Sequence, residues 1–288
     1  MRSPRTTARA TTFALLLAGL VALAVLASPA AGTSNGVPRI VFPLVAKTLW
    51  WDSYGDARPN GMHTGIDIEA PWRAPVVAVE PGRVEYGESS LGGCMLYLHG
   101  RSGTTYMYIH LNNDVTARFD NRGRCHETAY AVPDGARVSV GEQVAWNGDS
   151  GDAEGNPHLH FEVHPNGGSP SNPYLHLKRA SRPLFAAKVG SAFSLALRGK
   201  VLSSGPVSLT LDVDRVRHYP GGRWLDVDGR TVKLAVVPDR LTTQSSPQVR
   251  RPSAASPVVV YTRKGRTTTA AIVGATGALH VARVVPAR

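Results

Sequence analysis

Short apolar runs separated by turn residues make up most of residues 40–178. Several of these runs alternate apolar and polar positions with a period of two, which is typical of half-buried β-strands. No stretch of ten or more residues there has a convincing helical period. We therefore predict a mainly β chain whose first module is an antiparallel sheet structure. The predicted strands lie at Pro75–Val79, Met95–Leu98, Thr104–Ile109, Val144–Trp146 and His158–Val163.

A different apolar run, Phe13–Leu26, follows arginines at the start of the chain and precedes small residues. Its 14 residues are fewer than the ~20 that a membrane-spanning helix needs. This pattern is typical of a signal peptide, so we predict residues 1–30 as one, with cleavage after Ala30. The mature protein is then expected to be secreted, extracellular or in the cell wall, without a transmembrane anchor.

Further strand-like runs occupy the last third of the chain. The pair Asp228-Gly229 predicts a hairpin turn among them. We predict a first module at residues 38–178, followed by a smaller β-rich module at residues 184–288.

Charge divides the chain in a similar way. Of the 32 Lys+Arg and 21 Asp+Glu, residues 32–180 carry 12 basic and 16 acidic side chains, whereas residues 181–288 carry 17 and five. This basic second part is either a solvated surface or a site that attracts an anionic polymer. In an exported protein that polymer is expected to be peptidoglycan or another anionic component of the cell envelope. We expect no nucleic-acid partner, because no motif that reads nucleic acid is present, and the sequence predicts no oligomeric state.

Histidines gather in the first module, and their spacing is that of a metal site. In a strand, His158 and His160 lie on one face, roughly 6.5 to 7 Å apart at the Cα atoms. His63 and Asp67 also share a face if extended, but about 13 Å apart, which is too far for one ion. Gly65 between them provides the freedom for a bend that brings both side chains to one metal. This predicts His63 at the end of a loop and Asp67 at the start of a strand.

Two neutral imidazoles and one carboxylate, with water as the fourth ligand, suit a catalytic zinc site. Zinc lowers the pKa of its bound water from 15.7 towards about 7 and polarises a carbonyl. Further histidines, such as His110, are available to take the proton of the water and to stabilise the intermediate. The absence of a His-Glu-x-x-His motif excludes the usual helical zincin. Each short pattern by itself is more often packing or surface than a ligand set, so the prediction depends on their combination.

That combination resembles the lysostaphin-type (LytM-type) zinc metallopeptidases, which are mostly cell-wall hydrolases. The resemblance covers roughly residues 40–178. Its motifs are His63-Thr64-Gly65-Ile66-Asp67, His110-Leu111, Gly141-Glu142-Gln143-Val144, Pro157-His158-Leu159-His160-Phe161-Glu162 and Asn172-Pro173.

The resemblance implies that His63, Asp67 and His160 bind zinc. It implies that His110 and His158 are catalytic, as general base and stabiliser of the intermediate, without saying which residue has which role.

An aromatic residue precedes the first ligand in this family, and Tyr54 is therefore expected to contact substrate. The segment Asn112–Pro133 is longer than the usual connection, which leaves the shape of the substrate groove open. No role is assigned to the four histidines of the first module that lie outside the motifs, His99, His126, His164 and His176.

Cys94 and Cys125 are the only cysteines. An even pair of cysteines in an exported protein predicts a disulfide. Closing a loop of this length contributes roughly 3 to 4 kcal/mol on the chain-entropy model. The bridge is expected to hold the long inserted segment to a core strand.

These observations lead us to expect an exported zinc metalloendopeptidase that hydrolyses peptide bonds in bacterial peptidoglycan, with zinc-activated water and two assisting histidines. The alternative is a non-catalytic LytM-type protein that binds the cell wall or regulates other hydrolases. Such members lack zinc ligands, whereas all five positions are present here. A third hypothesis keeps the chemistry but makes exported proteins or peptides the substrate.

Overall fold

The computed structural model describes residues 36–59, 61–188, 193–205, 208–218, 222–236, 249–250, 259–260, 267–274 and 280–286. The predicted signal peptide, residues 1–30, lies outside the described residues. Within these ranges, no helix is long and apolar enough to cross a membrane.

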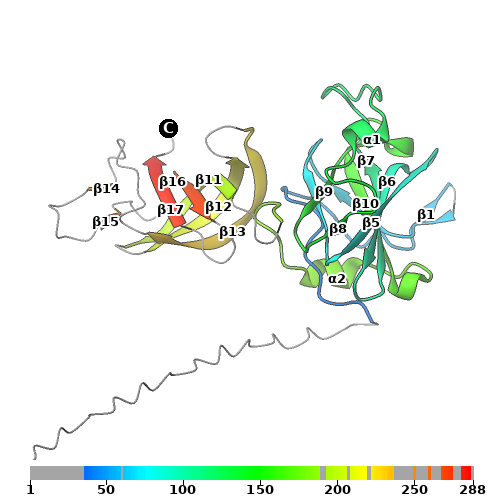
Figure 1. The fold of residues 1–288 in the computed structure, drawn as a ribbon, viewed down its shortest axis with the longest axis horizontal. Helices are drawn as coiled ribbons and strands as arrows, with labels where there is room; N and C mark the ends of the chain where they lie inside the picture. Colours follow the sequence, from blue (N-terminus) through cyan, green and yellow to red (C-terminus); the bar gives the residue numbers. More distant parts are fainter. Residues whose placement is uncertain are drawn as a thin grey trace, which may run out of the picture. The chain divides into compact units, whose positions relative to one another are not determined.

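A six-stranded sheet forms the centre of the first module (Figure 1), and all its neighbouring strands are antiparallel. This confirms the predicted antiparallel β class. In spatial order its strands are β3 (Ile66–Glu69), β10 (His158–His164), β7 (Thr105–Leu111), β6 (Gly93–Gly100), β5 (Gly82–Ser89) and β8 (Arg137–Val138).

Smaller elements surround this sheet. The helical segments are short, as expected from the missing helical period. The strand pairs are β1 (Ala57–Arg58) with β2 (Gly61–Met62) and β4 (Pro75–Val77) with β9 (Gln143–Trp146); the helices are α1 (Cys125–Thr128) and α2 (Tyr174–Arg179), with 3₁₀ turns η1 (Gly151–Ala153) and η2 (Pro165–Gly167).

Alternation along β10 and β3 decides which side chains enter the core. Leu159, Phe161 and Val163 of β10 are fully buried in the apolar cluster of this module, as are Ile66 and Ile68 of β3. Burying a side chain of this size stabilises the fold by about 1.5–3 kcal/mol. Because successive residues of a strand point to opposite faces, the residues between them face away from this core.

The predicted disulfide between Cys94 and Cys125 is present, with 5.3 Å between the two Cα atoms. Cys94 lies on β6, and Cys125 is the first residue of α1. The bridge therefore ties the long inserted segment to a buried strand of the central sheet.

The second module contains a closed five-stranded barrel (Figure 1), which confirms its predicted β-rich character. Its neighbours are antiparallel except β13 and β17, which are parallel. In order around the barrel the strands are β11 (Phe193–Ser204), β12 (Ser208–His218), β13 (Leu225–Val236), β17 (His280–Pro286) and β16 (Thr267–Gly274); β14 (Val249–Arg250) pairs with β15 (Val259–Val260) outside it.

The hairpin predicted at Asp228-Gly229 is wrong, because both residues lie inside β13. The pairing of β12 with β13 shifts register between Val213 and Arg215. A glycine inside a strand commonly marks such a bulge, so the same residues that favour a turn here accommodate an irregularity in a continuous strand. The module boundaries at 38–178 and 184–288 stay predictions.

Candidate metal centre

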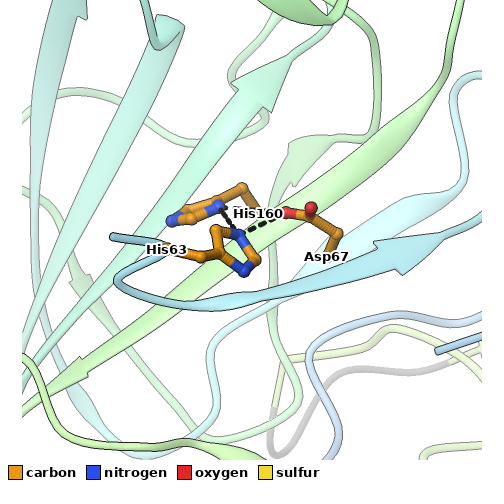
Figure 2. Close-up of side chains that lie close together, drawn as sticks. All are labelled: His63, Asp67 and His160. Carbon is orange, nitrogen blue, oxygen red and sulfur yellow. Dashed lines mark hydrogen bonds and ion pairs between the residues drawn. The ribbon is translucent and has the colours of Figure 1, made fainter. Parts of the chain in front are cut away.

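Three side chains that the sequence singled out converge on one point (Figure 2). The Nε2 atom of His63 lies 2.9 Å from Nδ1 of His160 and 3.0 Å from Oδ1 of Asp67. Nδ1 of His160 lies 3.0 Å from the same Oδ1 atom. Ligands bound to zinc at about 2.0–2.1 Å in a tetrahedron lie roughly 3.3 Å from one another. The nitrogen and oxygen donors and their spacing therefore fit a zinc ion.

Strand pairing brings these side chains together. His160 of β10 is directly opposite Asp67 of β3 in the sheet register. His63 follows β2 and precedes β3, so the predicted places of His63 in a loop and Asp67 near a strand start agree with the structure.

Gly65 matters for its lack of a side chain. A Cβ atom there would lie 2.6 Å from the Phe161 carbonyl oxygen and 2.7 Å from Nε2 of His160. These distances are shorter than real Cβ contacts, so only glycine lets the loop after His63 pass this close to β10.

Outer hydrogen bonds orient both imidazoles. His63 donates from Nδ1 to the Ser53 carbonyl at 2.7 Å, which leaves Nε2 facing the centre. His160 donates from Nε2 to Oε1 of Glu162 at 2.9 Å, which leaves Nδ1 facing the centre. Arg58 donates to the second oxygen of Asp67 at 2.8 Å. Such outer partners fix the tautomer and the orientation of metal ligands.

The carboxyl groups of Asp67 and Glu162 are ionised at neutral pH. Burial raises the pKa of Asp67, but contacts with His160 and His63 outweigh it and hold that pKa well below its usual range. The pKa of Glu162 is likewise held low, against the effect of burial, by hydrogen bonds from His160 and His164. Burial lowers the pKa of His160, whereas its hydrogen bonds to Asp67 and Glu162 raise it more strongly, to about 9. Without a metal, these contacts therefore favour a proton on the ring of His160.

His110 and His158 lie beside this centre, with ring centroids 4.8 Å apart. Nδ1 of His110 donates to the Ser150 carbonyl, and Nδ1 of His158 donates to the Asn156 carbonyl, both at 2.8 Å. These bonds leave Nε2 of each ring for other contacts: Nε2 of His158 lies 3.7 Å from Oδ1 of Asp67, and Nε2 of His110 lies 3.7 Å from Oδ1 of Asp152. Burial, with the nearby charge of His158, lowers the pKa of His110 to about 4.

The backbone of His110 is also unusual, with a φ angle of 61°. Non-glycine residues seldom adopt this left-handed conformation, and such strain concentrates at functional sites.

A cleft of about 720 Å³ contains all five predicted metal and catalytic residues. Its wall includes Trp51, Met62 and Leu91, each of which is about half exposed or more. Tyr54 is not among the lining residues, and its hydroxyl donates to the Pro170 carbonyl at 3.0 Å. The ring of Tyr54 packs against the core, whereas Trp51 lines the cleft, and the substrate contact of Tyr54 stays a prediction.

Sequence reasoning missed three residues at the site, Arg58, Glu162 and His164. The signal for two of them was present, because residues two apart in a strand share a face. Continuing the pattern of His158 and His160 by two and four positions reaches Glu162 and His164. Arg58 carried no comparable signal, because only the bend at Gly65 brings its hairpin to Asp67.

No protein-family model matches the chain. The chain is 33% identical over 115 residues to an uncharacterized metalloprotease of Haemophilus influenzae, over 39% of this chain and 20% of that protein. It is 30% identical over 144 residues to the DD-carboxypeptidase/endopeptidase Mpg of Neisseria meningitidis, over 48% of this chain and 29% of that protein. The match therefore spans less than a third of the length of either relative.

Among solved structures, the chain is similar to the catalytic domain of the antimicrobial peptidase lysostaphin from Staphylococcus simulans. That domain is 27% identical, with a TM-score of 0.35, over 46% of this chain and 92% of the domain.

Proposed function

The first module resembles the lysostaphin-type (LytM-type) metallopeptidases, and from this we propose that the protein is an exported zinc metalloendopeptidase that hydrolyses peptide bonds in bacterial peptidoglycan. The observation that carries the proposal is the convergence of His63 Nε2, Asp67 Oδ1 and His160 Nδ1 within about 3 Å of one another. This is a donor set of catalytic zinc sites, with a fourth position left for water.

His63, Asp67 and His160 would hold the ion. When bound, zinc supplies a Lewis acid that polarises the scissile carbonyl and lowers the pKa of water. Asp67 is ionised, which favours a cation, and the outer bonds from Ser53 and Glu162 keep the imidazole lone pairs aimed at the centre.

His110 and His158 then move protons. Each ring is anchored through Nδ1 to a backbone carbonyl, so each has only Nε2 available to the cleft. An Nε2 lone pair accepts the proton of the attacking water, and the resulting N–H donates to the leaving amine or to the developing oxyanion. Because the pKa of His110 is lowered to about 4, its Nε2 is an unprotonated acceptor at neutral pH, and we assign the general base to His110. His158, whose Nε2 lies 3.7 Å from the Asp67 carboxylate, is then assigned to stabilise the intermediate.

Three observations support peptidoglycan as the substrate. One relative is named as a DD-carboxypeptidase/endopeptidase. The signal peptide predicted at residues 1–30 would take the chain to the envelope, where peptidoglycan is found. The basic second module would be attracted to an anionic polymer of the envelope.

The non-catalytic alternative is less favoured, because all three ligands and both assisting histidines line the cleft. The hypothesis that exported proteins or peptides are the substrate keeps the same chemistry and is separated by the substrate used in the test.

The test measures metal content and the release of new amino groups from purified cell wall, with casein in parallel. We expect one zinc per chain and cleavage of cell wall that stops with a chelator and returns with zinc. The variant His160→Ala should lose both, whereas His99→Ala, an exposed histidine outside the cleft, should keep both. Zinc binding with cleavage of casein alone would contradict the proposed substrate, and a protein that binds no zinc would contradict the proposed function.

A further inference from the structure

A chain of hydrogen bonds continues outward from the ligand His160. Oε1 of Glu162 accepts from Nε2 of His160 at 2.9 Å, and Oε2 of Glu162 accepts from Nε2 of His164 at 2.6 Å. Nδ1 of His164 donates to the Gly168 carbonyl at 2.8 Å. His160, Glu162 and His164 share one face of β10, because they are two positions apart. This series of hydrogen bonds therefore runs from the metal centre to the backbone just after η2.

Both ring nitrogens of His164 act as hydrogen-bond donors. The Gly168 carbonyl only accepts hydrogen bonds, so it fixes Nδ1 of His164 as a donor. Glu162 is a carboxylate, so Nε2 of His164 is a donor as well. His164 thus faces an acceptor on each side, which favours its doubly protonated, cationic form.

The orientation of the Glu162 carboxylate depends on its bond to His164. Its side chain is 8% exposed and that of His164 is 16% exposed, so water does not replace the interaction easily. Oε1 of Glu162 has a second donor in the Thr64 hydroxyl at 2.5 Å, whereas among the described residues the hydrogen-bond partner of Oε2 is His164. No arginine or lysine of the described residues forms an ion pair with Glu162.

We propose that His164 is a positioning residue for the metal ligand His160, acting through Glu162. By holding Glu162 as an oriented carboxylate, His164 keeps a proton on Nε2 of His160 and the lone pair of Nδ1 aimed at the metal. Without His164, Oε2 of the carboxylate has no hydrogen-bond partner among the described residues, and only the bonds of Oε1 to Thr64 and His160 hold its orientation, so the acceptor that selects the tautomer of His160 is held less firmly. This inference rests on the proposed metal site.

The test measures the zinc dissociation constant of the purified protein by competition with a coloured chelator. Loss of outer partners of a metal ligand costs about 10- to 100-fold in metal affinity, and we expect His164→Ala to weaken zinc binding by about 10-fold. His164→Gln, which keeps one donor towards Glu162, should recover part of this loss. The matched control is His99→Ala, which removes another histidine–glutamate pair, His99 with Glu85, on neighbouring strands away from the metal.

A double-variant cycle tests whether His164 acts through Glu162. Glu162→Gln alone should weaken zinc binding at least as much as His164→Ala, and adding His164→Ala to Glu162→Gln should change it by less than about twofold. Additive losses would overturn the inference. The absorption spectrum of the cobalt-substituted protein should shift in His164→Ala, because the orientation of a ligand changes, and should stay unchanged in His99→Ala.

The outcomes separate this inference from the proposed function. If the wild-type protein binds zinc and His164→Ala binds it equally well, the inference fails and the proposed function stands. If the wild-type protein binds no zinc, both fail. If His164→Ala does not fold, as judged by thermal unfolding of the metal-free protein, the comparison of His164→Gln with wild type decides.

Discussion

His63 and His160 are 97 residues apart in the chain, yet Nε2 of the first lies 2.9 Å from Nδ1 of the second. The pairing of β3 with β10 sets His160 opposite Asp67, and the bend at Gly65 returns His63 to the same point. In the metal-free protein the hydrogen bonds of His160 to Asp67 and Glu162 favour a proton on its ring. A metal ion takes the place of that proton, and this exchange has a measurable consequence.

Zinc affinity should fall as the pH is lowered. The pKa of His160 is raised to about 9, so below pH 9 a proton competes with zinc for Nδ1. The dissociation constant should then rise by about tenfold for each unit of pH below this value. Titration with zinc at pH 6, 7, 8 and 9 checks this, with correction for buffer binding. A dissociation constant that does not change between pH 7 and pH 9 would contradict the assigned state of His160.

Replacing His110 or His158 should separate metal binding from catalysis. His110→Gln and His158→Gln remove the Nε2 lone pair from the cleft but leave the three ligands in place. We expect zinc content equal to that of the wild type and a loss of about 10²- to 10⁴-fold in kcat. His176→Gln, on α2, is the control with normal activity. Loss of zinc from either cleft variant would show that the residue holds the metal rather than moving protons.

Gly65→Ala should disrupt the centre without a change of charge. Its Cβ would lie 2.6 Å from the Phe161 carbonyl oxygen and 2.7 Å from Nε2 of His160, so the loop has to move away from β10. We expect weaker zinc binding and a lower Tm. Gly205→Ala, whose Cβ would meet its nearest neighbour at 3.9 Å, should leave both unchanged. Normal zinc affinity in Gly65→Ala would mean that the loop accommodates a methyl group.

Asp149→Asn should stabilise the protein at neutral pH. Asp149 and Asp114 are fully buried, and burial together with the adjacent Asp114 carboxyl raises the pKa of Asp149 to about 6. A raised pKa means that the folded state prefers the protonated acid. The contribution of Asp149 to the free energy of unfolding is therefore fully present below pH 4 and is lost as the pH rises through 6. Asparagine does not ionise, so the variant keeps its stability over this range. The difference in Tm between the variant and the wild type should therefore grow from pH 4 to pH 6. Asp56→Asn, at an exposed carboxyl, is the control. A pH-independent difference in Tm between Asp149→Asn and the wild type would contradict the prediction.

Removing the disulfide should destabilise the first module. The variant Cys94→Ser/Cys125→Ser opens a loop with a sequence separation of 31, and the chain-entropy model predicts a loss of roughly 3 to 4 kcal/mol in the free energy of unfolding. Urea unfolding of the variant and of the wild type measures the difference. Reduction of the wild type should reproduce it, and equal stability would mean that packing of the inserted segment is sufficient.

Local patterns predicted the elements that carry the site well. The alternation along His158–Val163 predicted a strand and placed both of its histidines on one face, because the two-residue period is a property of the extended backbone itself. The same pattern misled at Asp228-Gly229, because the residues that favour a turn also fit a bulge inside a strand. That Trp51 rather than Tyr54 lines the cleft had no signal in the sequence, because side-chain direction in a loop has no period.

The sequence by itself determined the β class, the set of candidate ligands and the pairing of the only two cysteines, because these follow from composition, local period and motif. Tertiary structure alone decided that Asp67 and His160 share a register, that Arg58 reaches Asp67, and that the carboxylate of Glu162 hydrogen-bonds to both His160 and His164. The physical reason is distance along the chain: a strand sets the direction of its own side chains, but their partners are set by the register between strands and by the packing that holds it.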